Sequence, residues 1–220
     1  MSRFWEDIYS EMKDELQLNF SLDSASAELL HSYNSFSDIV WNRAMKLKGK
    51  RFLVIGNAEN FSHDRIRNMI DGNTVIVVAD SAIGRMGGDH VPHIIVTDLD
   101  GDMDKITEFC MQGSIIFTHS HGDNMEKIKK YVPGFRGMFI PTCQNCNDMY
   151  NPEGFTDGDR AVKISEKLGA SEIILAGFDF TKPYGKGNPG TKKRKLEYAR
   201  KIIEREIEDG AKIRFIQDIS

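Results

Sequence analysis

From residue 50 onward, short apolar runs alternate with amphipathic segments. Several of the runs are apolar almost throughout, as expected for strands that helices cover on both faces. We predict strands at 51–56, 74–80, 93–98, 114–119, 137–142, 172–177 and 212–217. We predict helices between them, at about 61–71, 103–112, 123–131, 158–168 and 191–209. This alternation predicts an α/β fold with a doubly wound, mostly parallel sheet.

The first 49 residues have a different pattern, with apolar side chains at helical spacing in two stripes. The stripes are Trp5, Ile8, Tyr9, Met12 and Leu16, and then Leu29, Tyr33, Phe36, Val40, Ala44 and Leu47. We therefore expect an N-terminal helical cap at 1–49 and an α/β domain at 50–220. Such a cap packs on the main domain or on a second subunit, so we also consider a homodimer.

Composition narrows the class of protein. The chain has 33 acidic and 29 basic residues, a net charge of -4 that gives no reason to expect nucleic-acid binding. No apolar run approaches the roughly 18 residues of a membrane span. The N-terminus is too acidic and polar for a signal peptide, and three cysteines do not form a disulfide framework. We expect a cytoplasmic protein without a membrane partner.

Polar side chains gather where the predicted strands end. In parallel sheets, ligands bind beyond the carboxyl ends of the strands. The residues there include Asn57, Asp80, Ser81, Asp98, Asp100, His119, His121, Gly122, Asp123 and Asp179. In an extended chain Asp98 and Asp100 point the same way, and two adjacent carboxylates favour a cation such as Mg²⁺. The alternative is a pair of solvated loop acids.

Two other enzyme classes share parts of this pattern. The segment "DLDG" resembles the nucleophile motif of haloacid-dehalogenase-type phosphatases, but that motif normally opens its domain and here two predicted strands precede it. The segment "THSHGDN" resembles the zinc motif of metallo-β-lactamase-fold hydrolases. Asn124 replaces its last histidine, and no histidine follows His121 to complete the site. The two histidines of the segment then bind phosphate or a substrate ring, or simply cap a turn.

The remaining motifs exclude more than they indicate. Cys143 and Cys146 have a spacing seen in zinc and redox sites, but two ordinary loop cysteines explain them as well. The chain has no Gly-x-x-x-x-Gly-Lys-Ser/Thr pattern, which excludes a Walker-type nucleotide site. The segment "GNAEN" stands where a dinucleotide-binding fold has its glycine-rich turn, which argues against that fold.

The order of the motifs resembles the archaeal-type 6-hydroxymethyl-7,8-dihydropterin pyrophosphokinase family, which is related to thiamin pyrophosphokinase. The resemblance lies in "VVADSAIGRM" (77–86), "VTDLDG" (96–101), "THSHGDN" (118–124) and "FTDGDRAVKISEKLGASEIILAGFDF" (155–180). The chain departs from the family at "GNAENF", which lacks a Gly-Pro-Ser character, so the way in which the nucleotide is held stays open.

The resemblance implies a Mg²⁺-dependent diphosphotransferase of folate- or methanopterin-type cofactor synthesis. It would move diphosphate from ATP to a hydroxymethyl pterin and release AMP. Asp98 and Asp100 would hold Mg²⁺, with Asp80 as a third acid. His119, His121 and Asp123 would orient phosphate or pterin, and Asp179 would bind the heterocycle or complete the acid cluster. For Asp157 and Asp159, helix capping and function are both open.

A cluster of cations begins at the end of a segment rich in Gly, Pro and Lys at 178–193. Lys192, Lys193, Arg194 and Lys195 are either a solvated helix face or part of a lid over the triphosphate, with Lys192 and Lys193 as nucleotide ligands. The alternatives to the pterin enzyme are a thiamin pyrophosphokinase, a nucleotide-sugar transferase on the same scaffold, and a non-catalytic nucleotide-binding module.

Overall fold

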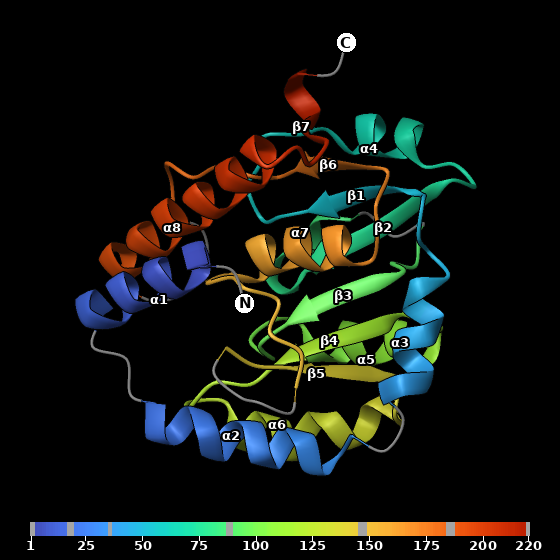
Figure 1. The fold of residues 1–220 in the computed structure, drawn as a ribbon. Helices are drawn as coiled ribbons and strands as arrows, with labels where there is room; N and C mark the ends of the chain where they lie inside the picture. The colour runs from blue at the N-terminus through green and yellow to red at the C-terminus, as the bar shows by residue number, and fades with distance from the viewer. Residues whose placement is uncertain are drawn as a thin grey trace.

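A computed structural model describes residues 3–16, 20–34, 37–86, 90–144, 149–183 and 188–218. Within these ranges, seven parallel strands form one sheet in the order β5-β4-β3-β2-β1-β6-β7 (Figure 1). The strands are β1 (Arg51–Ile55), β2 (Thr74–Ala79), β3 (Ile94–Thr97), β4 (Ile115–His119), β5 (Phe139–Thr142), β6 (Glu172–Ala176) and β7 (Ile213–Phe215). Each matches a predicted strand, and the predicted α/β class is confirmed. The sheet is parallel at every recorded pairing of these strands.

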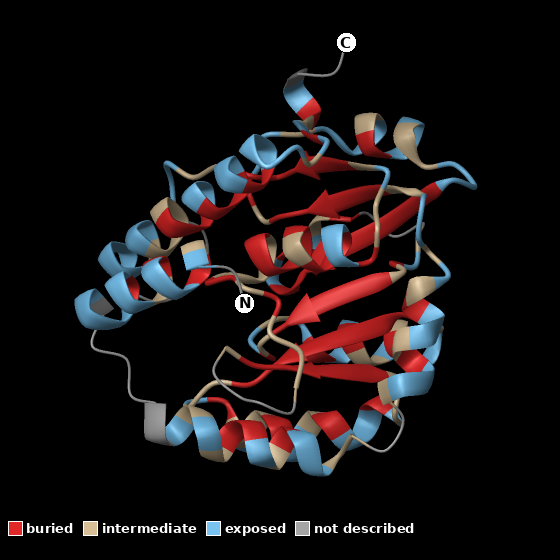
Figure 2. Cartoon of the chain, viewed as in Figure 1, coloured by how far each residue is buried: buried red, intermediate tan, exposed pale blue. Residues whose placement is uncertain are grey.

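The sheet is buried on both faces, which explains why its strands are apolar almost throughout. In β1, Leu53 and Ile55 belong to the apolar cluster on one face, and Phe52 and Val54 belong to the cluster on the other. The strands are accordingly buried, whereas the outer sides of the helices are exposed (Figure 2). Because successive side chains of a strand are buried on one face or the other, polar side chains are found mainly at the strand ends.

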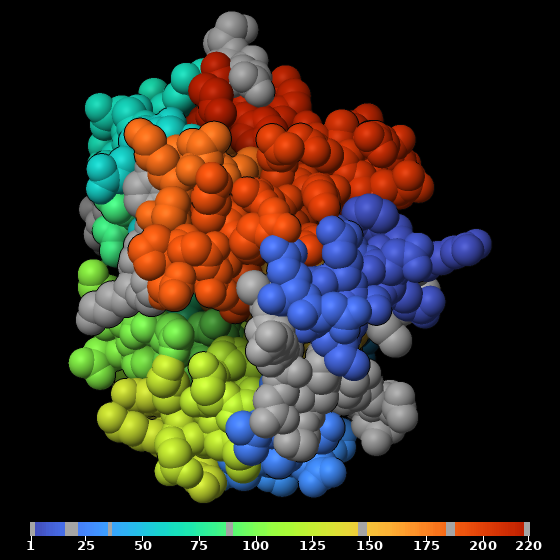
Figure 3. All heavy atoms as spheres, turned by 90° about the vertical axis from the view of Figure 1, so that its left-hand side faces the viewer, coloured from blue at the N-terminus to red at the C-terminus, as the bar shows by residue number. Residues whose placement is uncertain are grey.

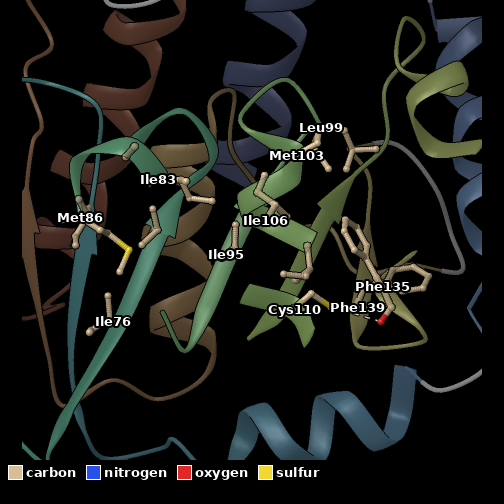
Figure 4. Close-up of a cluster of buried hydrophobic side chains, with 14 of the residues drawn as sticks. Ile76, Ile83, Met86, Ile95, Leu99, Met103, Ile106, Cys110, Phe135 and Phe139 are labelled. Carbon is tan, nitrogen blue, oxygen red and sulfur yellow. Dashed lines mark hydrogen bonds between the residues drawn. The ribbon is translucent and has the colours of Figure 1, made fainter. Parts of the chain in front are cut away.

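Helices cover both faces of the sheet. The first face packs against α4 (His63–Met69), η1 (Asp80–Arg85), α5 (Met103–Met111), α6 (Met125–Tyr131), η2 (Val132–Phe135) and part of η3 (Ile216–Asp218). Figure 4 shows this layer, with Ile106 of α5 beside Ile95 of β3. The second face packs against α3 (Ser37–Met45), α7 (Asp157–Lys167) and α8 (Pro189–Glu208). None of the described helices is long and apolar enough to cross a bilayer.

The N-terminal helices pack on the α/β part of the same chain. Helix α1 (Arg3–Leu16) buries Trp5, Ile8 and Met12 against Phe155 and against α8, and it lies along α8 in Figure 3. The division into a cap and an α/β domain stays a prediction, as does the homodimer.

The second apolar stripe belongs to two helices, α2 (Phe20–Ser32) and α3, rather than to one. Leu29 and Tyr33 pack with the cluster on the first face, whereas Val40 and Ala44 pack with the cluster on the second. Both helices contact β5, so this part of the chain passes around the β5 edge of the sheet. Phe36 lies outside the described residues. The chain therefore changes faces within one apparent stripe, which periodicity alone does not reveal.

Candidate active site

Three carboxylates meet at the carboxyl ends of β2 and β3. Asp80 follows β2, Asp98 follows β3, and Asp157 is the first residue of α7. One oxygen from each lies within 4.8 Å of the others. Adjacent parallel strands bring the first two together, and α7 brings the third because it packs across β1, β2 and β3. We call Asp80, Asp98 and Asp157 the acid group.

Asp80 is held rigidly in this group. Its Oδ2 accepts hydrogen bonds from Thr97 Oγ1 and from the backbone N–H of Asp100, each at 2.9 Å. Its Oδ1 is buried and has no hydrogen-bond partner in the described part of the chain. Burial, followed by the nearby charge of Asp98, raises the pKa of Asp80 to about 7. A buried carboxylate oxygen without a partner is where a cation is expected.

The other two acids have opposite electrostatic environments. Burial opposes ionisation of Asp98, but a hydrogen bond from His121 and the charges of Arg160 and Lys195 outweigh it and lower its pKa to about 2. Burial, together with the charge of Asp98, raises the pKa of Asp157 well above its usual value. Arg160 Nη1 donates to Asp157 Oδ1 at 3.1 Å. Three carboxylates with opposed pKa values fit a hard divalent cation such as Mg²⁺, which would replace the retained protons.

Asp100 lies elsewhere than the sequence pattern suggests. Its carboxylate is 58% exposed and pairs with Lys127 of α6, while its backbone contacts Asp80. The reason is Leu99, which has a positive φ of 68° and turns the chain between the two aspartates. The rule that residues i and i+2 point the same way holds only in extended chain. The structure thus places Asp157, rather than Asp100, beside Asp98.

The start of α7 shows that Asp157 is not the cap of this helix. Thr156 is the N-cap, and it forms a capping box with Asp159. The carboxylate of Asp159 also accepts from the backbone N–H of Phe155. Capping therefore falls to Thr156 and Asp159, while Asp157 faces the acid group.

The two histidines of the "THSHGDN" segment lie in different environments. His119 is fully buried, and its Nδ1 is 2.9 Å from Thr142 Oγ1. Burial and the nearby cation Arg160 lower the pKa of His119 well below its usual value. His121 is partly exposed, with Nε2 3.4 Å from Asp98 Oδ2 and Nδ1 bonded to Asp123. The side chains are thus not aligned for one metal, and only His121 reaches the surface of the site.

Asn124 is the centre of a buried hydrogen-bond network. Its Oδ1 accepts from the backbone N–H of His121 at 3.1 Å and from Ser26 Oγ at 3.0 Å. Its Nδ2 donates to the backbone oxygens of Asp98 at 3.0 Å and His119 at 2.8 Å. One side chain thereby joins the ends of β3 and β4 to α2. A carboxamide has the two donors and the acceptor that this position requires, which a zinc-binding histidine lacks.

A pocket of about 280 Å³ adjoins the acid group. It is lined by Met12, Leu22, Asp23, Asp98, His121, Gly122, Asp123, Gln144, Phe155, Arg160 and Lys195. Asp98 belongs to both the pocket and the acid group, so a ligand in the pocket lies next to the candidate cation site. The volume is near the lower end for ligand pockets, which suits one substrate rather than two.

Sequence reasoning missed several of these lining residues. Met12, Leu22 and Asp23 come from the N-terminal helices, and no motif marks them. Arg160 is buried in α7. It directly follows the segment Thr-Asp-Gly-Asp at 156–159, and this position was the one feature of the sequence that could have marked it as a site residue. Among the four clustered cations at positions 192–195 of α8, Lys195 lines the pocket, whereas Lys192 and Lys193 do not.

The remaining predicted residues lie outside the acid group and the pocket. Asn57 Oδ1 accepts from Arg85 Nε at 3.2 Å, Ser81 is exposed in η1, and Asp179 Oδ1 accepts from Thr181 at the end of β6. Their roles in nucleotide binding stay predictions. Cys143 is buried and disulfide-bonded, and Cys146 lies outside the described residues.

Comparisons with known proteins identify the family of this chain. The family model described as "6-hydroxymethylpterin diphosphokinase MptE-like" matches residues 28–185. A relative from Methanocaldococcus jannaschii named 6-hydroxymethyl-7,8-dihydropterin pyrophosphokinase is 30% identical, over 97% of this chain and 98% of its own. A relative of the same name from Methanothermobacter thermautotrophicus is 32% identical, over 91% and 92%. The chain belongs to the MptE-like family of 6-hydroxymethylpterin diphosphokinases.

Proposed function

We propose that this protein transfers diphosphate from ATP to the hydroxymethyl group of 6-hydroxymethyl-7,8-dihydropterin and releases AMP. Family membership supports the reaction. The observation that carries the proposal for these residues is a substrate-sized pocket that shares Asp98 with a group of three carboxylates. A phosphate-transfer site needs its cation and its acceptor side by side.

The chemistry requires charge neutralisation and positioning. The hydroxymethyl oxygen attacks the β-phosphorus of ATP, the bond from that phosphorus to the α,β-bridging oxygen breaks, and AMP leaves with the bridging oxygen. The hydroxyl proton is released, and the acceptor keeps the β and γ phosphates. Asp80, Asp98 and Asp157 would hold Mg²⁺, which supplies charge neutralisation for the triphosphate. Arg160 and Lys195 add positive charge at the pocket, and His121 orients the carboxylate of Asp98.

The direct test is an acceptor assay. The purified protein is incubated with ATP and Mg²⁺ and with the reduced pterin, thiamin or no acceptor, and AMP and the diphosphorylated acceptor are quantified by chromatography. We expect equal amounts of AMP and pterin diphosphate, and no product without Mg²⁺. Product with thiamin alone, or ATP binding without turnover on any acceptor, contradicts the proposal.

The raised pKa of Asp80 predicts how pH and Mg²⁺ act together on stability. A free aspartate loses its proton near pH 3.9, whereas native Asp80 retains it up to about pH 7. The native state therefore binds more protons in this window, and the metal-free protein loses stability as pH rises from about 4 to about 7. Below pH 7 Mg²⁺ must displace that proton, so the rise in Tm on adding Mg²⁺ should be larger at pH 8 than at pH 6.

Thermal unfolding with and without Mg²⁺ at both pH values measures this effect. Asp80→Asn should reduce its pH dependence, because one of the two members of the acid group with a raised pKa, Asp80 and Asp157, is gone. Asp100→Asn is the matched control and should preserve it, since Asp100 pairs with Lys127. An equal Mg²⁺ effect at both pH values in the unmodified protein would argue against a cation at the acid group.

A further inference from the structure

The N-terminal helices form part of the pocket wall, and one carboxylate among them is unexplained. Met12 of α1 and Leu22 and Asp23 of α2 all line the pocket. Helix α2 approaches the turn after β4 so closely that a Cβ on Gly122 would lie 2.5 Å from Leu22 Cβ. The backbone N–H of Gly122 donates to Asp23 Oδ1 at 2.6 Å. This contact fixes the Asp23 carboxylate at the pocket wall.

The other acids of the pocket are already engaged. Asp98 belongs to the acid group, and Asp123 is 84% exposed and bonded to His121. Asp23 Oδ2 has no hydrogen-bond partner within the described part of the chain. A carboxylate oxygen also has two lone pairs, so Oδ1 can accept a second hydrogen bond. Asp23 is thus the pocket acid that is available to a ligand.

The pocket is lined by two kinds of residue besides its acids. Met12, Leu22 and Phe155 supply apolar surface to the same pocket as Asp23, and Arg160 and Lys195 supply positive charge. The cationic residues suit phosphate, and the apolar residues suit a flat ring. A carboxylate beside an apolar wall pairs best with two adjacent N–H donors, because each donor then meets one oxygen lone pair.

We propose that Asp23 selects the acceptor by binding the N–H and amino group on the 2-amino-4-oxo edge of its pterin ring. The ring contacts Met12, Leu22 and Phe155, and its hydroxymethyl group points toward Asp98. This assignment rests on the proposed function. Adenine presents one amino donor next to a ring nitrogen acceptor, and so does the aminopyrimidine of thiamin. With either ring, one lone pair of the carboxylate would face the lone pair of the ring nitrogen. Asp23 therefore disfavours the binding of both rings at this position.

The test variant is Asp23→Asn. Its side-chain oxygen can still accept from Gly122, so the docking of α2 is preserved while the charge and one acceptor are lost. We expect kcat/KM for the pterin to fall about 100-fold, with an unchanged KM for ATP. Glu28→Gln is the matched control, because Glu28 is an exposed acid of the same helix outside the pocket. It should leave both constants unchanged.

A ring analogue gives a second readout that a general structural defect would not change. In 6-hydroxymethyl-7,8-dihydrolumazine an oxo group replaces the 2-amino group. The unmodified protein and Asp23→Glu should both prefer the pterin, whereas Asp23→Asn should lose most of this preference. An unchanged pterin-to-lumazine ratio in Asp23→Asn, or an equal rise in its KM for ATP, overturns the assignment.

Failure of the proposed function is a separate outcome. It appears as an absence of AMP with every acceptor in the unmodified protein. Titration of pterin fluorescence with the same variants then still tests Asp23, because it needs no turnover. Pterin binding that is equally tight in the unmodified protein and in Asp23→Asn contradicts the role of Asp23.

Discussion

Asp98→Asn and Asp157→Asn should each lower kcat by about 10³-fold or more, because a cation on the transferring phosphates contributes several kcal/mol to transition-state stabilisation. Asp100→Asn should lower kcat by less than about tenfold, since it removes only an exposed ion pair with Lys127. The three substitutions make the same chemical change. They differ in whether the carboxylate belongs to the acid group.

Steady-state AMP release measures kcat, and thermal unfolding in the absence of Mg²⁺ is the control for folding. Asp157→Asn should not destabilise the metal-free protein greatly, because it removes a buried acid that lies beside Asp98. A loss of activity in Asp100→Asn as large as in Asp98→Asn would assign the cation to the neighbouring pair in the sequence. A small effect in Asp157→Asn would remove α7 from the site.

Asn124→Ala should lower the free energy of unfolding by about 3–5 kcal/mol. The substitution leaves four groups without their partner: two backbone carbonyls, one backbone N–H and the hydroxyl of Ser26. Ser26→Ala is the matched control. It removes one of the four hydrogen bonds and should cost about 1 kcal/mol.

Urea denaturation of the unmodified protein, Asn124→Ala and Ser26→Ala measures their free energies of unfolding. Asn124→Asp is a further variant that tests the same hydrogen-bond network. Aspartate keeps the acceptor for His121 and Ser26 but loses both donated hydrogen bonds, and it places a negative charge near Asp98. It should therefore also destabilise the protein, and by more than Ser26→Ala does. If Asn124→Ala costs no more than Ser26→Ala, the turn after β4 is held by other contacts.

The sequence predicted the sheet well because β1 to β6 are buried on both faces. An uninterrupted apolar run such as that of β2 does not fit a surface helix, so it is interpreted as a buried strand. The polar residues that follow such runs then lie at one edge of the sheet. Asp80 and Asp98 were found this way, since each directly follows a strand. A parallel sheet places both residues at one edge, and the family resemblance implied that Asp80 joins Asp98 there.

The rest of the site depends on features that periodicity does not encode. The positive φ of Leu99 turns Asp100 away, and nothing in "TDLDGD" marks that residue as left-handed. Asp157 joins the acid group from a helix that follows Asp98 by almost sixty residues, so only the tertiary fold places it there. Asp23 lies on a helix of low amphipathic character, and its contact with Gly122 spans 99 positions in the sequence.

The contact of α1 with α8 has a consequence for how the protein acquires activity. Tyr198 Oη donates to Glu15 Oε2 across a sequence separation of 183 residues. A contact over such a separation cannot form before α8 has been synthesised. Because Met12 of α1 and Lys195 of α8 both line the pocket, a ribosome-bound chain that lacks α8 has an incomplete pocket. Under the proposed function, we expect activity only after these two distant helices are in contact.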